Sequence, residues 1–249
     1  MTRLSVVIVT FNEERNITRC LNSVKNIADD IVVVDSFSKD KTEQICIPYA
    51  VNFIPRKWEG YSSAKNFANL QGKHDWILSL DADEALSGEL QKSIIEWKQL
   101  PSPQSARFAR LSNYCGRWIH HCGWYPDIKI RIFDRRITNW TGEIHEKLSG
   151  VNQNKTLLLR GDCFHYSYYS VEEHCKQAEK YSDIASKDMH INGKKNFYLM
   201  IFLRTAHKFI RNYFIKLGFL DGNYGYVICK IIAWETYLKY SKLYKLNRY

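Results

Sequence analysis

Short apolar runs alternate with amphipathic segments through the first hundred residues of the chain. The apolar runs are rich in Val and Ile and are predicted to be strands, at residues 4–10, 31–35, 51–54 and 76–80. Helical patterns fall between them at residues 13–24 and 62–70, and small polar residues at 36–41 indicate a turn. Because strands that alternate with helices are typical of a mostly parallel sheet with crossover helices, the sequence predicts an α/β domain.

The next part of the chain changes its pattern. A helix is predicted over residues 87–100, and two strands follow at residues 106–113 and 128–133. Ser170 and Glu173 have the spacing of a capping box, so a further helix is predicted from there to about Met189. We therefore expect a main α/β domain over residues 1–189 and a separate helical segment over residues 190–249.

Composition adds an expectation about the compartment. Hydrophobic residues make up 45% and charged residues 25% of the 249 residues, which is typical of a folded globular protein. The seven cysteines are scattered and form no Cys-x-x-Cys pair, which favours buried free thiols. The apolar run at residues 4–10 is too short for the core of a signal peptide, so we expect a cytosolic protein.

The net charge of +10 is concentrated in the last segment. Residues 194–249 contain eleven Lys or Arg and two acidic residues. The helical pattern at residues 197–217 places four cations on roughly one stripe, namely Arg204, Lys208, Arg211 and Lys216. A second basic, aromatic helix is predicted over residues 226–246.

These helices are predicted to lie on an anionic membrane surface, at the inner face of the cell membrane. The apolar run at residues 197–203 is far shorter than the roughly twenty residues that span a bilayer. The alternative is a helical pair that packs on the main domain with a solvated basic face. No motif for nucleic-acid binding accompanies the charge, so no nucleic-acid partner is expected.

Two of the predicted strands end in an acidic residue, Asp35 after a run of valines and Asp81 after a second apolar run. In open α/β sheets the carboxyl ends of the strands form the ligand crevice. Asp81 and Asp83 stand one residue apart at such an end, where two carboxylates can hold Mg²⁺ or Mn²⁺ while substrate phosphates complete the coordination. The alternative is that these acids start turns or cap helices.

Four motifs together resemble the donor site of the family-two inverting glycosyltransferases, which have the GT-A fold. They are Ser5-Val-Val-Ile-Val-Thr-Phe-Asn-Glu13, Val32-Val-Val-Asp-Ser36, Ala64-Lys-Asn66 and Leu80-Asp-Ala-Asp-Glu84. Two later motifs are similar to a subgroup that contains lipopolysaccharide inner-core glucosyltransferases. They are Pro126-Asp-Ile-Lys-Ile-Arg-Ile-Phe133 and Trp140-Thr-Gly-Glu-Ile-His-Glu146.

The resemblance implies a role for each matched residue. The nucleotide would lie against Thr10, Asn12 and Glu13, with Glu13 near the ribose. Asp35 would accept a hydrogen bond from the base. Lys65 would approach the diphosphate, as expected for a cation beside a metal ion. Asp83 would be the direct metal ligand, and Asp81 would contact the ribose in part.

The resemblance also implies a catalytic base. Inverting sugar transfer needs a carboxylate that takes the proton of the acceptor hydroxyl. Glu146 is the favoured residue and Glu143 the reserve, because the family's usual Glu-Asp pair is replaced here by His145-Glu146. His165 is a candidate third metal ligand, although a packed, hydrogen-bonded histidine is the alternative. His120 and His121 lie in an aromatic segment that could line an acceptor groove or belong to a core.

The sequence thus predicts transfer of a hexose, for example glucose, from a nucleotide sugar such as a UDP-sugar. The expected acceptor is a lipid-linked saccharide, for example lipopolysaccharide core. One alternative is a catalytically silent sugar- or lipid-binding protein on the same fold. A nucleotidyltransferase is the other alternative, but such an enzyme ordinarily has a glycine-rich loop after the first strand, where this chain has Phe11-Asn12-Glu13-Glu14.

Overall fold

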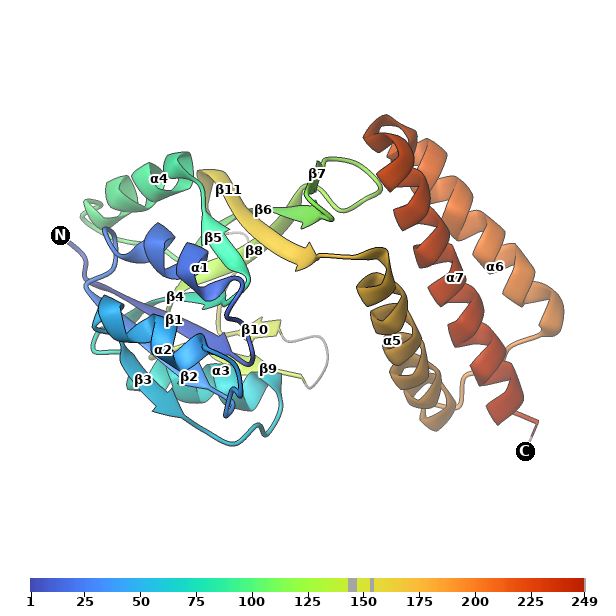
Figure 1. Ribbon diagram of the computed structural model, residues 1–249, viewed down its shortest axis with the longest axis horizontal. Coiled ribbons are helices and arrows are strands. Elements are labelled where there is room, and N and C mark those ends of the chain that lie inside the picture. Colours follow the sequence, from blue (N-terminus) through green and yellow to red (C-terminus); the bar gives the residue numbers. More distant parts are fainter. Residues whose placement is uncertain (143–146, 153–154, 249) are drawn as a thin grey trace. The chain divides into compact units, whose positions relative to one another are not determined.

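The computed structural model describes residues 1–142, 147–152 and 155–248, which form two compact units (Figure 1). The first unit comprises residues 1–110 and 127–166, and the second comprises residues 111–126 and those from 167 onward. Two strands, β6 (Ala106–Tyr114) and β11 (Leu157–Tyr168), contribute residues to both units. Each unit is described by itself below.

The first unit is built on one sheet with the strand order β3-β2-β1-β4-β8-β6-β11-β5. Its first four strands are β1 (Leu4–Thr10), β2 (Asp30–Asp35), β3 (Asn52–Pro55) and β4 (Trp76–Asp81). These four pair in parallel, whereas β8 (Asp127–Asp134) runs antiparallel to β4 and to β6. β5 (Glu84–Leu86) runs antiparallel to β11 at the opposite edge. The predicted α/β class is confirmed.

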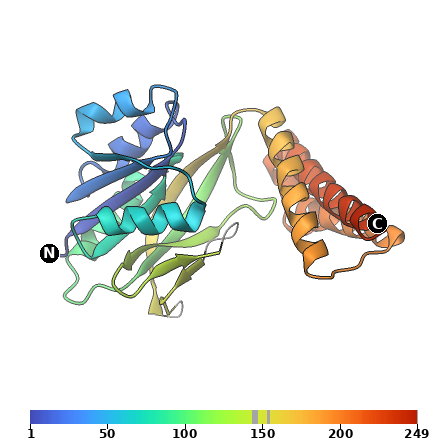
Figure 2. The ribbon, with the colours of Figure 1, turned by 90° about the horizontal axis from the view of Figure 1, so that it is seen from below.

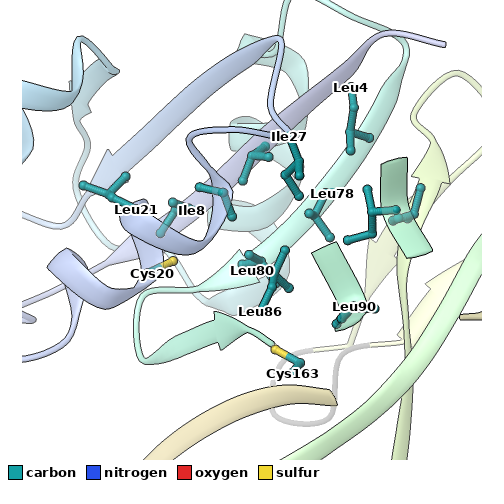
Figure 3. Packing of buried hydrophobic residues seen from close by; sticks show 14 of the residues in the cluster. Leu4, Ile8, Cys20, Leu21, Ile27, Leu78, Leu80, Leu86, Leu90 and Cys163 are labelled. Carbon is teal, nitrogen blue, oxygen red and sulfur yellow. The ribbon is translucent and has the colours of Figure 1, made fainter. Parts of the chain in front are cut away.

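Helices cover both faces of the parallel part (Figures 1 and 2). Alternate residues of a strand point to opposite faces. Leu4 and Ile8 of β1 accordingly pack with α1 (Ile17–Val24) and α4 (Gly88–Lys98), as Figure 3 shows in part, while Val7 packs with α3 (Tyr61–Gln71) on the other face. The unit also contains α2 (Thr42–Cys46), a short 3-10 helix at Ile47–Tyr49, β9 (Asn139–Thr141) and β10 (Lys147–Ser149).

The predicted strands of the parallel part agree with the structure to within one residue at each end. The first helix begins at Ile17 rather than at Glu13. The amide of Glu13 instead donates to Thr42 Oγ1 at 2.9 Å, so this residue belongs to the loop that enters the helix. The sequence does not predict β5, β9 or β10, because a three-residue strand is too short to show a period. It does not predict β11 either, because this strand mixes apolar, charged and aromatic residues.

The second unit contains β7 (Arg117–Ile119) and three long helices, α5 (Val171–Ile191), α6 (Tyr198–Ile210) and α7 (Gly222–Leu246). Short helical turns at Arg211–Ile215 and Gly218–Asp221 join α6 to α7. Ser170 caps α5 as predicted, since its Oγ accepts from the amide of Glu173 at 3.2 Å. Both α5 and α6 pack along α7, and the three helices belong to one compact unit.

The predicted stripe of four cations is split in the structure. Arg204 lies over the ring of Tyr240 at 4.4 Å, and both Arg204 and Lys208 are half-buried. Arg211 and Lys216 are exposed. The exposed positions of α6 are instead largely apolar, and include Tyr198, Leu199, Phe202, Leu203 and Ile210. In the described part of the chain, none of the helices combines the length and the hydrophobicity needed to cross a bilayer.

His174 gives the second unit a pH-dependent stability. Its side chain is buried among Tyr114, Trp124 and Tyr168, with Nδ1 3.1 Å from Tyr114 Oη. Burial lowers the pKa of His174 from 6.5 to about 4. The unfolded chain therefore takes up this proton at a higher pH than the folded chain, and the stabilisation, complete above pH 6.5, is lost as the pH falls toward 4.

We predict that the free energy of unfolding falls more steeply between pH 7 and 4 in the wild type than in His174→Gln. Denaturant titrations followed by tryptophan fluorescence at several pH values measure the two slopes. Parallel slopes would show that His174 carries no linked proton.

Candidate functional site

The loops after β1 and β2 form one wall at the carboxyl ends of the parallel strands. The amide of Asn12 donates to Ser38 Oγ at 2.7 Å, and Asn12 Oδ1 accepts from the amide of Lys39 at 2.8 Å. Asn12 has a φ of 55°, a left-handed conformation that asparagine tolerates better than most residues. These hydrogen bonds fix the two loops to each other.

Thr10 and Asp35 lie opposite each other, as paired residues of β1 and β2. Asp35 is buried and accepts from the amide and the hydroxyl of Ser38. Thr10 is also buried, and its Oγ1 has no hydrogen-bond partner in the described part of the chain. A buried hydroxyl without a hydrogen-bond partner lowers the stability of the fold, unless a ligand or a water molecule supplies the missing hydrogen bond.

Phe11 and Phe37 directly follow these strand ends and are 54% and 58% exposed. The sequence analysis overlooked both rings. Their position in the sequence, directly between the end of a predicted strand and a polar loop, could have identified them as candidate ligand contacts. Exposed aromatic side chains beside the polar strand ends could stack on a planar ligand.

Asp81, at the end of β4, is held between two cations. Its Oδ1 lies 3.0 Å from Lys65 Nζ on α3, and its Oδ2 lies 3.0 Å from the guanidinium of Arg131 on β8. Burial disfavours the charged carboxylate, but the positive charges of Lys65 and Arg131 prevail and hold the pKa of Asp81 well below its usual range. Asp81 is therefore an anion whose two oxygens are both engaged.

The same guanidinium extends the network to Glu84, whose side chain is fully buried. Arg131 lies 2.5 Å from Glu84 Oε1, and Arg110 of β6 lies 3.3 Å from the same oxygen. Arg110 also pairs with Asp127 at 2.7 Å. Glu84 Oε2 accepts from the amide of Asp81 at 3.1 Å, so this glutamate also closes the turn after β4. The sequence analysis did not single out Arg110 or Arg131, although a cation inside an apolar strand was a usable signal.

Asp83 points to a different partner. Its Oδ2 lies 3.2 Å from His165 Nε2, and its backbone oxygen accepts from the amide of Tyr166 at 2.9 Å. This proximity depends on the pairing of β5 with β11, in which His165 is opposite Glu84. The structure thus brings together two residues that are about eighty positions apart in the sequence.

Glu13 is close enough to this pair to respond to its charges. Burial is the main cause that raises the pKa of Glu13 to about 7, and the negative charges of Asp83 and Asp40 add to it. A hydrogen bond from Asn16 and the charge of His165 act in the opposite direction. Glu13 is consequently poised to change its protonation state near neutral pH.

The described residues contain no preformed cluster of three or more metal-ligating side chains. Asp83 and His165 nevertheless offer a carboxylate oxygen and an imidazole nitrogen, a donor set that suits Mn²⁺ and can be completed by phosphate and water. Both oxygens of Asp81 are engaged with cations, which favours Asp83 over Asp81 as the metal ligand.

The segment that carries the predicted base is anchored to α3. Asn66 exchanges two hydrogen bonds with the backbone of Trp140, at 2.8 and 2.9 Å, and Ser62 Oγ donates to the carbonyl of Gly142. Glu143 and Glu146 themselves lie outside the described residues. The other predicted site residues, Thr10, Asn12, Glu13, Asp35, Lys65, Asp81, Asp83 and His165, all belong to the first unit.

A family model described as glycosyl transferase family 2 matches residues 5–151, which is more than half of the chain. The chain belongs to glycosyl transferase family 2. An uncharacterised glycosyltransferase of Rickettsia typhi is 32% identical over 99% of this chain and 88% of its own. The lipopolysaccharide core biosynthesis glycosyltransferase LpsC of Rhizobium meliloti is 27% identical over 97% of this chain and 92% of its own.

Solved structures provide a more distant comparison. A glucosyl-3-phosphoglycerate synthase from Mycobacterium tuberculosis, in complex with Mn²⁺ and UDP-glucose, is 18% identical with a TM-score of 0.38. The similarity covers 45% of this chain and 44% of that one, so this chain matches less than half the length of that synthase. The family membership and the sheet topology agree with the predicted GT-A-type fold.

We predict that Arg131→Met destabilises the protein by about 3 kcal/mol or more, because it leaves Glu84 as a buried charge with a lost partner. The matched change Arg136→Met removes an exposed arginine that follows the same strand, and we expect it to cost less than about 1 kcal/mol. Chemical denaturation measures both values. Equal costs for the two variants would show that the Arg131 network contributes no more than a surface pair.

Proposed function

We propose that this member of the family transfers a hexose from a nucleotide diphosphate sugar to a lipid-linked saccharide, with inversion at the anomeric carbon. The proposal rests on one observation, that two acids at the end of β4 have different partners. Asp81 is paired with the cations Lys65 and Arg131, whereas Asp83 lies beside His165. The similarity to LpsC over nearly the full chain supports a saccharide acceptor of the lipopolysaccharide core type.

In this proposal the nucleotide lies along the wall formed by the first two loops. The buried carboxylate of Asp35 is an acceptor for a base N–H, and the Thr10 hydroxyl gains the partner that it lacks in the described structure. Asn12 holds the loop in shape, and Glu13 lies near the ribose. Uracil suits this arrangement, because it has one ring N–H that can donate to the buried carboxylate of Asp35.

A divalent cation, Mg²⁺ or Mn²⁺, would be held by Asp83 and His165 together with the donor diphosphate. When bound, it neutralises the charge that develops on the departing nucleoside diphosphate. Lys65 supplies a second positive charge, since its ammonium group lies at the end of β4 and can contact a phosphate oxygen while it remains near Asp81.

The acceptor oxygen forms a bond to the anomeric carbon as the bond from that carbon to the diphosphate oxygen breaks. A carboxylate must take the hydroxyl proton in this step. We assign this role to Glu146, with Glu143 as the alternative. The hydrogen bonds that tie Trp140 and Gly142 to α3 support the assignment, because α3 also carries Lys65.

We also propose that the enzyme works at the cytosolic face of the membrane, where lipid-linked acceptors are available. The exposed cations Arg211 and Lys216 would attract an anionic lipid surface.

The metal assignment predicts that Asp83→Asn abolishes metal-dependent binding of UDP-sugars without loss of the fold, because a neutral amide is a poor ligand for a hard cation. Isothermal titration calorimetry with and without Mn²⁺ measures this effect. Asp188→Asn, which changes an exposed acid on α5, is the matched control and should bind as the wild type does. Unchanged metal-dependent affinity in Asp83→Asn would reject the assignment.

The base assignment predicts that Glu146→Gln retains donor affinity and lowers turnover by at least about a hundredfold, the scale of lost general-base assistance. Turnover is measured as nucleotide release in the presence of acceptor. Normal turnover in Glu146→Gln with an inactive Glu143→Gln would move the role to Glu143. Normal donor binding without any transfer or hydrolysis in the wild type would favour a silent binding protein.

A further inference from the structure

The second unit contains a cavity of about 330 Å³ that the donor site does not use. Two segments of this unit form its walls, residues 120–126 and residues 215–217. The sequence analysis placed His120 and His121 in a segment that could line an acceptor groove, and both residues face this cavity.

Hydrogen bonds to one buried carboxylate shape the cavity. The side chain of Asp221 is only 6% exposed, and it accepts from the amides of His120 and His121 at 3.2 and 2.9 Å. It also lies 3.1 Å from Nδ1 of His121. The amide of Cys122 donates to the carbonyl of Lys216 at 3.1 Å, which ties the two walls together. The cavity is therefore built by the fold and does not arise from loose side chains alone.

Two polar side chains of the cavity, His121 from one wall and Lys216 from the other, suit an anion and sugar hydroxyls. Because Nδ1 of His121 is occupied by Asp221, Nε2 is the nitrogen left for a ligand. Lys216 is exposed and has no carboxylate partner in the described part of the chain, and its stem runs beside Gly123. An ammonium group and an imidazole nitrogen can bind a phosphate and a neighbouring hydroxyl.

The wall at residues 215–217 also contributes two apolar side chains to the cavity. Ile215 and Leu217 line it, yet they are 69% and 44% exposed. Phe214, Phe219 and Leu220 are close in sequence and are also exposed. Several large apolar side chains exposed within one short segment are typical of a binding region. Exposed cations at Arg211 and Lys216 adjoin it, and such a combination of apolar and basic side chains suits the boundary of an anionic lipid layer.

We propose that this cavity binds the phosphorylated head of a lipid, with Lys216 and His121 on the head group and Ile215 and Leu217 against its hydrocarbon. The inference rests on the proposed function, because it identifies the phosphate-bearing part of the lipid-linked acceptor as the group that the second unit captures. It also assigns lipid contact to the turn between α6 and α7, rather than to Arg204 and Lys208.

The test uses the full chain without nucleotide sugar and phosphatidylcholine vesicles with or without phosphatidic acid. We expect Lys216→Met to weaken binding to the phosphatidic acid vesicles roughly tenfold, the loss of one charge-assisted contact. Lys245→Met, near the far end of α7, removes the same charge and should bind as the wild type does. Equal binding by the wild type and Lys216→Met would overturn the proposal. Equal losses in the two lysine variants would also overturn it, in favour of diffuse attraction.

Two further variants distinguish the contacts with the head group from the contacts with the hydrocarbon. His121→Asn keeps a side-chain N–H for Asp221 and removes Nε2, so it should weaken binding of both phosphatidic acid vesicles and soluble glucose 6-phosphate. Ile215→Ser should weaken binding of the vesicles only. Unchanged vesicle binding in Ile215→Ser would reject the lipid part of the proposal. Concentration-dependent self-association that Ile215→Ser abolishes would assign the apolar surface to a second copy of the chain and overturn it as well.

UDP-sugar binding, measured by calorimetry in the same variants, tests the proposed function separately from the role of the cavity. We expect it to remain unchanged, since all the altered residues belong to the second unit. Absence of UDP-sugar binding in the wild type would contradict the proposed function, whereas the vesicle results would still decide the role of the cavity.

Discussion

The placement of Asp81 between Lys65 and Arg131 is the interaction on which the candidate site depends. It joins α3, β4 and β8, and through Arg131 it also reaches the buried carboxylate of Glu84. Charges withdrawn from water are costly, so each member of this network needs the others. A site built in this way has little freedom to rearrange, because moving any one side chain would leave a buried charge with fewer partners.

This network explains why two acids only one residue apart have different partners and can have different roles. Asp81 is committed to cations, whereas Asp83 faces His165 and can give its carboxylate to a metal ion. The raised pKa of Glu13 reflects the same crowding of acids, since burial and the charge of Asp83 both disfavour its ionisation. A cation and a diphosphate would meet complementary charge here, with Lys65 on one side and Asp83 on the other.

The sequence predicts the parallel strands closely, because buried β-branched runs rarely adopt another structure, and it places Asp35 and Asp81 at the ends of two of these strands, as the structure has them. It does not predict Arg131 as the partner of Asp81, since pairing of β4 with β8 depends on long-range packing that no local period reveals. It also predicts four cations on one stripe of a helix at residues 197–217, but it does not predict which neighbours these side chains face. In the structure Arg204 lies on Tyr240 and the exposed positions are largely apolar.

The central claim is that Asp83, and not Asp81, holds the donor's metal ion at the end of β4. A crystal structure with UDP and Mn²⁺, with the metal located by its anomalous scattering, tests this most directly. We expect a manganese peak bonded to the carboxylate of Asp83 and next to His165, with Asp81 still paired to Lys65 or Arg131. A peak on Asp81 with those two cations displaced, or a metal bound away from both acids, would contradict it.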